Sequence, residues 1–296
     1  MSSQPAGDRS LLDELADRGW RIEDHAARRP EDGVWLLPDR DGAVSFPDEA
    51  RVALAELEDR SIWFRSRNLM ISSLLDRLAP GRTFVEIGSG NGAVAAHLTG
   101  EGVDVMAVEP AVAGASVAAR RGVATVVAGF VEELGLPDGS LPRVGLFDVI
   151  EHLPDETPVL AEVRRTLVPG GTCIVTVPAF RWLWSQADET AGHHRRYRRA
   201  DLDRLFTDAG FERRFSSYCF LTAIGPLFLL RALPYRRGRR LDAQAMEEQS
   251  VRELAGQGAA LNQIGWRLAQ LEAWWTRRRR LPFGTSVISV YTTPSS

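Results

Sequence analysis

The feature that most constrains the fold is an alternation of short apolar runs with helical segments through the middle of the chain. Strand-like runs are predicted at residues 83–87, 104–109, 123–128, 145–150 and 172–177. Helical patterns are predicted between them at residues 93–98, 113–121 and 156–167. The run at 172–177 is a continuous apolar run with β-branched threonine and valine, which suits a strand buried on both faces. Strands and helices that alternate at this spacing predict a parallel, doubly wound α/β sheet.

Further elements extend the alternation at both ends. A helical pattern at 48–78 precedes it; a loop at 181–199 rich in aromatic and basic residues, a helix at 201–209 and strands at 211–220 and 286–293 follow it. We predict a Rossmann-like α/β fold whose seven-stranded sheet is mostly parallel, with an antiparallel last strand. The predicted parts are an N-terminal extension with cofactor-covering helices (1–80), the core (81–220), a helical lid or insertion (221–282) and the last core strand (283–296).

Composition limits the classes of function. All 36 cationic residues are arginines, which indicates the coding bias of a high-GC bacterium, and the net charge of −3 gives no global field that would attract nucleic acid. The two cysteines, Cys173 and Cys219, are too few for a metal-ligand set or a disulfide framework. Residues 1–24 lack the layout of a signal peptide, and the longest apolar run, 219–234, is too short to span a bilayer. We therefore expect a cytoplasmic protein that binds no nucleic acid.

A glycine-rich loop lies where the first predicted strand gives way to a helix. Residues 85–92 read Val-Glu-Ile-Gly-Ser-Gly-Asn-Gly. Glycines let the backbone turn sharply and approach a ligand closely, and the N–H groups of the following helix point at that ligand. Glu109 ends the next strand, where a carboxylate can accept hydrogen bonds from both hydroxyls of a ribose. The loop and the carboxylate together predict a nucleotide-like cofactor.

Two cofactors compete for this loop. Gly88, Gly90 and Ala93 also fit the G-x-G-x-x-A fingerprint of NAD(P)-dependent oxidoreductases. Glu86 would then lie near an anionic pyrophosphate, where a carboxylate is poorly placed. The same carboxylate is tolerated beside S-adenosyl-L-methionine (SAM), which carries a positive sulfonium and an amino group that can donate to it. The sequence therefore favours SAM, with NAD(P) as the alternative.

Between residues 62 and 211 the chain resembles the class I SAM-dependent methyltransferases. The nearest branch contains the ubiquinone-biosynthesis O-methyltransferases and bacterial natural-product and sugar-linked enzymes. The resemblance rests on the loop at 85–92, on Val-Glu-Pro at 108–110, on Phe-Asp-Val-Ile-Glu-His-Leu at 147–153 and on Leu-Val-Pro-Gly-Gly at 167–171. It implies methyl transfer from SAM, with S-adenosyl-L-homocysteine as the product.

The resemblance also implies a cofactor site. The methionine end of SAM would be held by Glu86, Gly88 and Gly90, the ribose by Glu109, and the adenine by the backbone at Gly129, Phe130 and Val131. Phe130 stands where family members often have an acidic residue, so backbone or packing must supply that contact. Arg67 is expected either to pair with the SAM carboxylate or to be a solvated arginine of an amphipathic helix. The remaining predicted cofactor contacts are Ser89, Gly92, Pro110, Asp148 and Ile150.

Two histidines are candidates for the base that would deprotonate an acceptor hydroxyl. His152 follows the fourth predicted strand, at the edge of the sheet beside the cofactor, although it could instead cap a helix or orient the loop. His193 follows the fifth strand, with Asp188 placed to orient it. The choice stays open, and a carboxylate acceptor would need no base. No metal site is expected, because adjacent histidines point apart and few carboxylates accompany them.

The acceptor is expected to be bulky and partly apolar. Its predicted contacts are Trp184, Asp188, Arg196 and Tyr197, with Arg196 binding an acidic group, unless these arginines only hold a structural loop. The insertion at 221–282 would cover the acceptor, and a weak membrane-surface contact through 219–240 and a homodimer are also considered. The predicted function is transfer of a methyl group to an oxygen of a small-molecule or peptide acceptor. The alternative is a non-catalytic SAM-binding scaffold or sensor, or an NAD(P)-dependent oxidoreductase.

Overall fold

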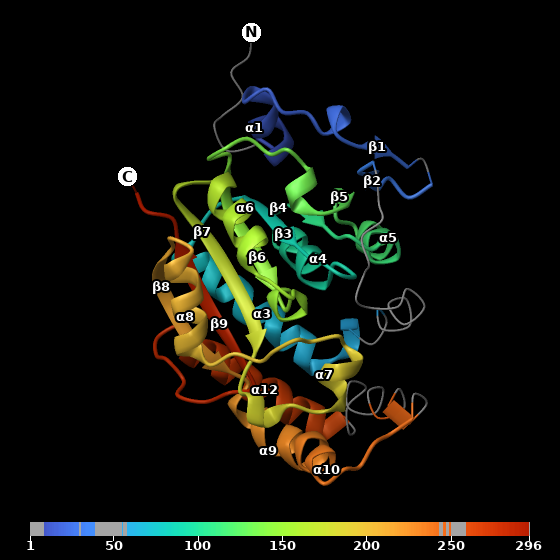
Figure 1. Cartoon of the computed structure of the whole chain (residues 1–296), viewed down its shortest axis with the longest axis vertical. Coiled ribbons are helices and arrows are strands. Elements are labelled where there is room, and N and C mark those ends of the chain that lie inside the picture. Colours follow the sequence, from blue (N-terminus) through green and yellow to red (C-terminus); the bar gives the residue numbers. More distant parts are fainter. Residues whose placement is uncertain are drawn as a thin grey trace.

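The structure is a computed structural model that describes residues 9–29, 31–38, 55, 58–242, 245–246, 249 and 259–295. One sheet crosses the whole molecule, in the order β1-β2-β5-β4-β3-β6-β7-β9-β8 (Figure 1). Its central strands β3, β4, β5, β6 and β7 run parallel. Their bounds are β3 (Thr83–Ile87), β4 (Asp104–Val108), β5 (Thr125–Ala128), β6 (Leu141–Phe147) and β7 (Leu167–Pro178).

The last strand in the chain lies inside the sheet and is antiparallel, as predicted. This strand, β9 (Ser286–Thr292), pairs antiparallel with β7 on one side and with β8 (Glu212–Cys219) on the other. The sheet has nine strands rather than the seven predicted. The two extra strands, β1 (Ala27–Arg28) and β2 (Trp35–Leu36), extend the edge beside β5. They were missed because two residues are too few to give a periodic signal.

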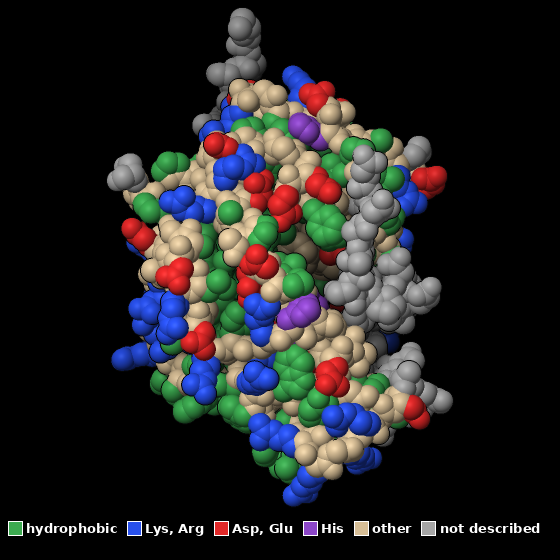
Figure 2. Space-filling view, in the orientation of Figure 1, with side chains coloured by type: hydrophobic (Ala, Val, Ile, Leu, Met, Phe, Trp, Pro, Cys, Tyr) green, Lys and Arg blue, Asp and Glu red, His purple; other side chains and the backbone are tan. Residues whose placement is uncertain are grey.

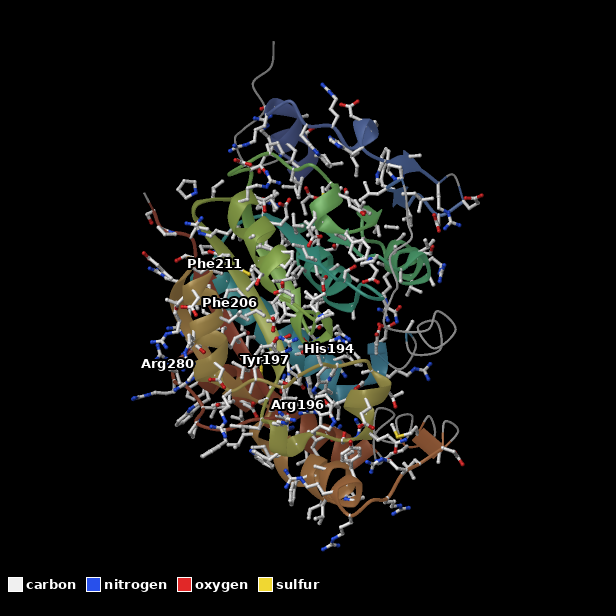
Figure 3. All side chains as sticks on the ribbon, viewed as in Figure 1. His194, Arg196, Tyr197, Phe206, Phe211 and Arg280 are labelled. Atoms are coloured by element: carbon white, nitrogen blue, oxygen red, sulfur yellow. The ribbon has the colours of Figure 1, made fainter. Side chains whose placement is uncertain are left out.

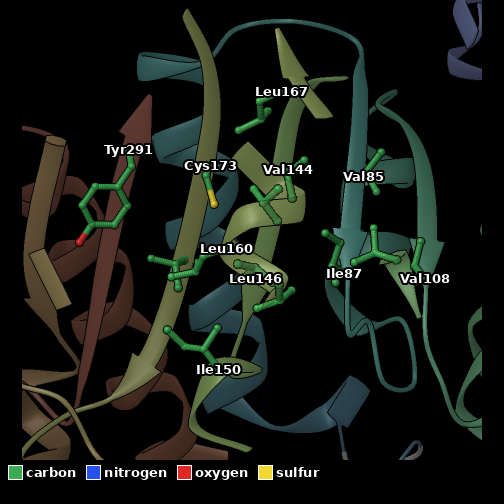
Figure 4. Packing of buried hydrophobic residues seen from close by; sticks show 14 of the residues in the cluster. Val85, Ile87, Val108, Val144, Leu146, Ile150, Leu160, Leu167, Cys173 and Tyr291 are labelled. Atoms are coloured by element: carbon green, nitrogen blue, oxygen red, sulfur yellow. The ribbon is translucent and has the colours of Figure 1, made fainter. Parts of the chain in front are cut away.

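Helices cover both faces of the sheet, because successive side chains of each strand point to opposite faces. Phe84 packs with α3 (Ile62–Leu78), α4 (Ala93–Gly100) and α5 (Val112–Arg120), whereas the next residue, Val85, packs with α6 (Thr157–Thr166) and α8 (Arg199–Asp208). Figure 4 shows the second layer, in which Val85, Val144 and Leu160 are fully buried. Burying an aliphatic side chain of this size stabilises the fold by about 1.5–3 kcal/mol. The predicted doubly wound sheet is confirmed.

The N-terminal part divides into two regions with different positions. Helix α1 (Leu11–Asp17) lies against the start of β4, where the Leu11 N–H donates to the Asp104 carboxylate at 2.6 Å. That edge of the sheet is opposite to the carboxyl ends of the parallel strands. Helix α1 is therefore not placed to cover a cofactor at those ends, and a covering role for α3 stays a prediction. Most of residues 39–57, which include the start of the predicted helix at 48–78, lie outside the described residues.

Three local predictions differ from the structure. The fourth strand ends at Phe147, three residues early, because Asp148 has φ +56° and turns the chain. The helix predicted at 156–167 ends at Thr166, because β7 begins at Leu167, with an irregular register against β6. The predicted loop at 181–199 contains a short helix, α7 (Gln186–Thr190), which begins with a capping box between Ser185 and Asp188.

The insertion before β9 is helical, as predicted. It contains α9 (Ile224–Leu227), a π-helical turn η6 (Phe228–Ala232), α10 (Leu233–Arg236) and α12 (Ala259–Thr276). Helix α12 packs along α3, and the insertion forms the end of the molecule opposite to α1 (Figure 1). Within the part of the chain that is described, no helix is both long enough and apolar enough to cross a membrane.

Candidate functional site

A cavity of about 540 Å³ opens at the carboxyl ends of the central strands. It joins the glycine loop after β3, the carboxylate after β4, the turn after β5 and the turn after β6. In open α/β sheets ligands bind in this position. The sequence-predicted residues that line it are Arg67, Glu86, Gly88, Ser89, Gly90, Glu109, Pro110, Gly129, Phe130, Val131, Asp148, His152 and His193.

The glycine loop needs glycine for two different reasons. Gly88 has φ +70°, and a Cβ atom there would lie 2.6 Å from the Val149 side chain, so the turn has no room for a side chain. Gly92 has φ +71° and precedes α4, where a Cβ atom would lie 2.5 Å from Ala118. Gly92 does not line the cavity, and its predicted cofactor contact is replaced by a packing role between α4 and α5.

Glu109 holds the glycine loop in place at Gly90. Its buried carboxylate accepts the backbone N–H of Gly90 at 2.8 Å and that of Ala111 at 3.0 Å. These contacts tie the end of β4 to the loop after β3 and aim the carboxylate at the cavity. A carboxylate fixed in this way is suited to accept hydrogen bonds from a ribose diol.

Glu86 is a buried carboxylate with an unsatisfied oxygen. It is 2% exposed, and its Oε2 atom has no hydrogen-bond partner. Burial raises the pKa of Glu86 to about 8, although the positive charge of Arg67 opposes the shift. A buried acceptor without a partner is costly, so this atom is suited to a ligand that brings a donor or a positive charge.

Arg67 lies in the cavity wall but already has a partner. Its guanidinium pairs with Asp148 at 2.6 Å and is 10% exposed. The arginine bridges α3 to the turn after β6, so the predicted alternative of a solvated arginine on a helix is wrong. The predicted pairing with the SAM carboxylate stays a prediction, because Arg67 lines the cavity and its Nε atom has no hydrogen-bond partner. Ile150 also needs correction, since it is buried outside the cavity lining and offers its carbonyl to Tyr197.

One ion pair behind the loop was not predicted. The carboxylate of Glu58 lies 2.7 Å from the Arg121 guanidinium, which also bonds to the carbonyl of Asn91 at 2.7 Å. Glu58 and Asn91 both line the cavity. No sequence signal connects these residues, because they lie 30 or more positions apart in the chain and meet only in the tertiary structure.

On the other side of the cavity two histidines meet. The rings of His152 and His193 are 4.7 Å apart, edge to face, and both line the cavity. The Nδ1 atom of His193 lies 3.0 Å from the carboxylate of Asp188, which is 1% exposed. Burial would raise the Asp188 pKa, but the hydrogen bond with His193 and the charge of Arg196 outweigh burial and lower that pKa to about 2. This carboxylate is therefore charged and orients His193.

Arg196 is not free to bind an acceptor. Its guanidinium makes two hydrogen bonds to Asp188, at 2.7 and 3.1 Å, and is 8% exposed. Tyr197 is buried, with its hydroxyl 2.7 Å from Glu156, and Trp184 likewise lies outside the cavity lining. Figure 3 shows Arg196, Tyr197 and His194 along the segment after β7. None of the four predicted acceptor contacts is part of the cavity wall; Asp188 instead holds His193, and Arg196 holds Asp188.

The described residues also offer one possible set of metal ligands. Ligand atoms of Glu151, His152 and His193 lie within 4.8 Å of one another. Glu151 is 1% exposed, and neither of its carboxylate oxygens has a hydrogen-bond partner. The sequence argument considered only the adjacent pair His193 and His194 and therefore missed this set, which the tertiary structure assembles. Two imidazoles and a carboxylate can bind several divalent cations.

Comparisons with known proteins agree with this geometry. The family described as a methyltransferase domain matches residues 63–214. A probable SAM-dependent methyltransferase of Mycolicibacterium smegmatis is 32% identical over 185 residues, covering 59% of this chain and 69% of the relative. A probable SAM-dependent methyltransferase of Mycobacterium tuberculosis is 32% identical over 162 residues, covering 53% of this chain and 58% of the relative. The C-methyltransferase NovU of Streptomyces niveus is 37% identical over 107 residues, covering 34% of this chain and 25% of NovU.

Solved structures share the fold at low sequence identity. A methyltransferase of Haloferax volcanii, in complex with the Trm112 activator, has a TM-score of 0.53 at 18% identity and covers 83% of this chain and 95% of that one. A SAM-dependent methyltransferase of Thermotoga maritima has a TM-score of 0.51 at 19% identity, with coverage of 84% and 95%. At these identities the likeness concerns the fold alone.

Proposed function

The chain belongs to the class I SAM-dependent methyltransferases, and we propose that it methylates an oxygen of a bulky small-molecule or peptide acceptor. The residues of the cavity fit SAM. The unpaired Oε2 of Glu86 lacks only a donor, and the glycine loop leaves open space at Gly90, where a Cβ atom would meet no protein atom within 4 Å. NAD(P) is disfavoured, because a pyrophosphate would lie against buried Glu86.

SAM supplies a methyl group on a positive sulfur. In the proposed arrangement Glu86 and the loop from Gly88 to Gly90 hold its methionine end, and Glu109 holds its ribose. The backbone from Gly129 to Val131 flanks the adenine. Catalysis then consists mainly of holding the acceptor oxygen in line and removing its proton.

We assign the proton transfer to His193. With Asp188 accepting from Nδ1–H, the free lone pair of His193 is at Nε2, which can take the proton of an acceptor hydroxyl. The observation that carries this proposal is the 3.0 Å contact between Asp188 and a histidine that lines the same cavity as the glycine loop. His152, whose ring meets His193, would position it or shape the acceptor pocket.

The test is turnover of His193→Ala and His152→Ala with an acceptor found by screening for S-adenosyl-L-homocysteine release. We expect His193→Ala to lower kcat by about 10²- to 10⁴-fold, with S-adenosyl-L-homocysteine affinity unchanged. The His152→Ala variant should lose less activity. Wild-type rates in both variants would rule out base catalysis by either histidine.

Two other functions have distinct outcomes. The similarity to NovU favours C-methylation as a second candidate, and a labelled methyl group found on carbon in the product would select it. A non-catalytic SAM-binding scaffold would bind S-adenosyl-L-homocysteine but methylate nothing in a broad panel. The cytoplasmic location and the homodimer stay predictions, which fractionation and light scattering test.

A further inference from the structure

The insertion end of the molecule combines exposed apolar residues with arginines. Leu229 and Leu230 on η6 are 59% and 54% exposed, and Trp274, Trp275 and Phe283, at and after the end of α12, are 48–55% exposed. Four exposed arginines lie at and after the end of α10, and four more follow α12. These are Arg236, Arg237, Arg239, Arg240, Arg277, Arg278, Arg279 and Arg280. Large exposed apolar residues gathered at one end and bordered by charged side chains are typical of a surface that binds a partner or a membrane.

A row of aromatic rings joins the two segments into one face. Phe283 lies 6.3 Å from Phe180, Phe180 lies 5.6 Å from Trp182, and Trp182 lies 5.7 Å from Phe228. The row runs from the start of the last strand, across the segment after β7, to the turn that carries Leu229. Figure 1 places α9, α10 and α12 together at this end, and Figure 2 shows blue arginines around green apolar side chains there. We call this surface the insertion face.

The charge of the insertion face is opposite in sign to that of the whole chain. Residues 221–242 and 263–283 contain ten arginines and two acidic residues, Asp242 and Glu272, whereas the chain as a whole carries −3. The Glu272 carboxylate accepts the backbone N–H of Leu221 at 3.1 Å, and it also contacts that of Phe220. It is therefore occupied at the helix junction and does not neutralise the exposed arginines.

From this combination we propose that the insertion face docks onto an anionic membrane surface without crossing it. Leucine side chains enter the acyl boundary, tryptophans sit at headgroup level and arginines meet the lipid phosphates. A second copy is a poorer occupant, because a two-fold interface would place these arginines against their own copies. Nucleic acid would use the arginines but would gain little from exposed leucines. The inference is independent of the proposed reaction and of the base assigned to it.

The face adjoins the acceptor side of the site. Trp182, in the middle of the aromatic row, belongs to the same segment after β7 that carries Asp188 and His193. The docked orientation would therefore bring the acceptor side of the cavity toward the bilayer. An amphiphilic acceptor could reach the site from the lipid surface in that orientation.

The experiment is flotation of the full chain with vesicles of phosphatidylcholine alone or mixed with phosphatidylglycerol. We expect co-flotation only with the phosphatidylglycerol vesicles, and less of it as salt is raised. The variant with Arg277, Arg278, Arg279 and Arg280 changed to Gln should lose at least about tenfold in partition. The matched control changes four exposed arginines elsewhere, Arg18, Arg77, Arg82 and Arg120, to Gln and should stay within about twofold.

A second variant separates apolar insertion from charge. Leu229→Ser with Leu230→Ser keeps every charge and should also reduce partition about tenfold. Unchanged circular dichroism and S-adenosyl-L-homocysteine affinity show that each variant is folded. The proposal is overturned by no flotation of the wild type, by equal binding to phosphatidylcholine, or by an equal loss in the arginine control. A dimer that the leucine variant dissociates, without flotation, would assign the face to self-association instead.

Discussion

Two buried carboxylates on opposite sides of the cavity differ in how they are satisfied. On the cofactor side, Glu86 has an unpaired oxygen and a pKa raised by burial to about 8. On the acceptor side, burial of Asp188 is outweighed by His193 and Arg196, which lower its pKa to about 2. Glu86 thus keeps one oxygen without a hydrogen-bond partner, whereas protein groups alone satisfy Asp188.

The difference indicates how the two sides work. A carboxylate that is poorly satisfied in the free protein contributes binding energy to a cationic ligand, because the ligand removes a desolvation cost. A carboxylate that is fully paired contributes orientation, since it fixes the position of its neighbour. The cofactor side is thus built to bind and the acceptor side to position a histidine. Four predictions test this contrast.

The largest effect is expected at Glu109. The Glu109→Ala change removes the predicted ribose acceptors and frees the Gly90 and Ala111 N–H groups. We expect S-adenosyl-L-homocysteine affinity to fall by about 100-fold, or about 3 kcal/mol, in calorimetric titration. Glu101→Ala, an exposed carboxylate at the end of α4, is the matched control and should bind normally. Tight binding of NADH by the wild type would instead return the loop to the dinucleotide hypothesis.

The next effect concerns stability at Glu86. Because its folded-state pKa is raised from 4.5 to about 8, the stabilisation is complete below pH 4.5 and is lost as pH rises through about 8. The free energy of unfolding should therefore fall by about 2 kcal/mol between pH 6 and pH 8. In Glu86→Gln this loss should largely disappear in urea titrations at each pH. Burial also raises the pKa of Glu151, which would account for a remaining slope. Parallel pH profiles for wild type and variant would contradict the assignment to Glu86.

A smaller effect is expected at Asp188. The Asp188→Asn change keeps the shape of the side chain but removes the charge that orients His193. We expect kcat to fall about tenfold, or about 1.4 kcal/mol, while S-adenosyl-L-homocysteine affinity stays the same. An affinity loss equal to the loss of kcat would mean that the acceptor side also takes part in binding the cofactor.

The smallest effect is expected from metal removal. If His193 acts as the base, dialysis against EDTA should leave turnover within about twofold. A large loss that Mg²⁺, Mn²⁺ or Zn²⁺ restores would instead assign Glu151, His152 and His193 to a cation. Glu151→Gln separates the two cases, because only a cation site loses metal affinity when this carboxylate is removed.

Much of the cofactor side could be predicted from the sequence because its parts are local. The glycine loop follows its strand directly, and Glu109 ends the neighbouring strand, so chain order fixes their place at one edge of the sheet. The predicted strand at 83–87 agrees with β3 residue for residue. The assignments of Gly92 and Ile150 to the cavity were wrong, because spacing gives a residue's place in an element but not the direction of its side chain.

The acceptor side shows the limit of such reasoning. The sequence predicted correctly that His152 and His193 lie at the same edge of the sheet. It also predicted that Arg196 binds the acceptor, whereas in the fold Arg196 pairs with Asp188. It also could not show that Glu151 joins the histidines, or that Phe283 and Phe228 belong to one row. Strands and turn motifs depend on residues that are neighbours in the chain, so the sequence alone determined the strand at 83–87, the glycine loop after it and the place of Glu109. Contacts between residues distant in the chain depend on how helices pack on the sheet, and only the tertiary structure decided them.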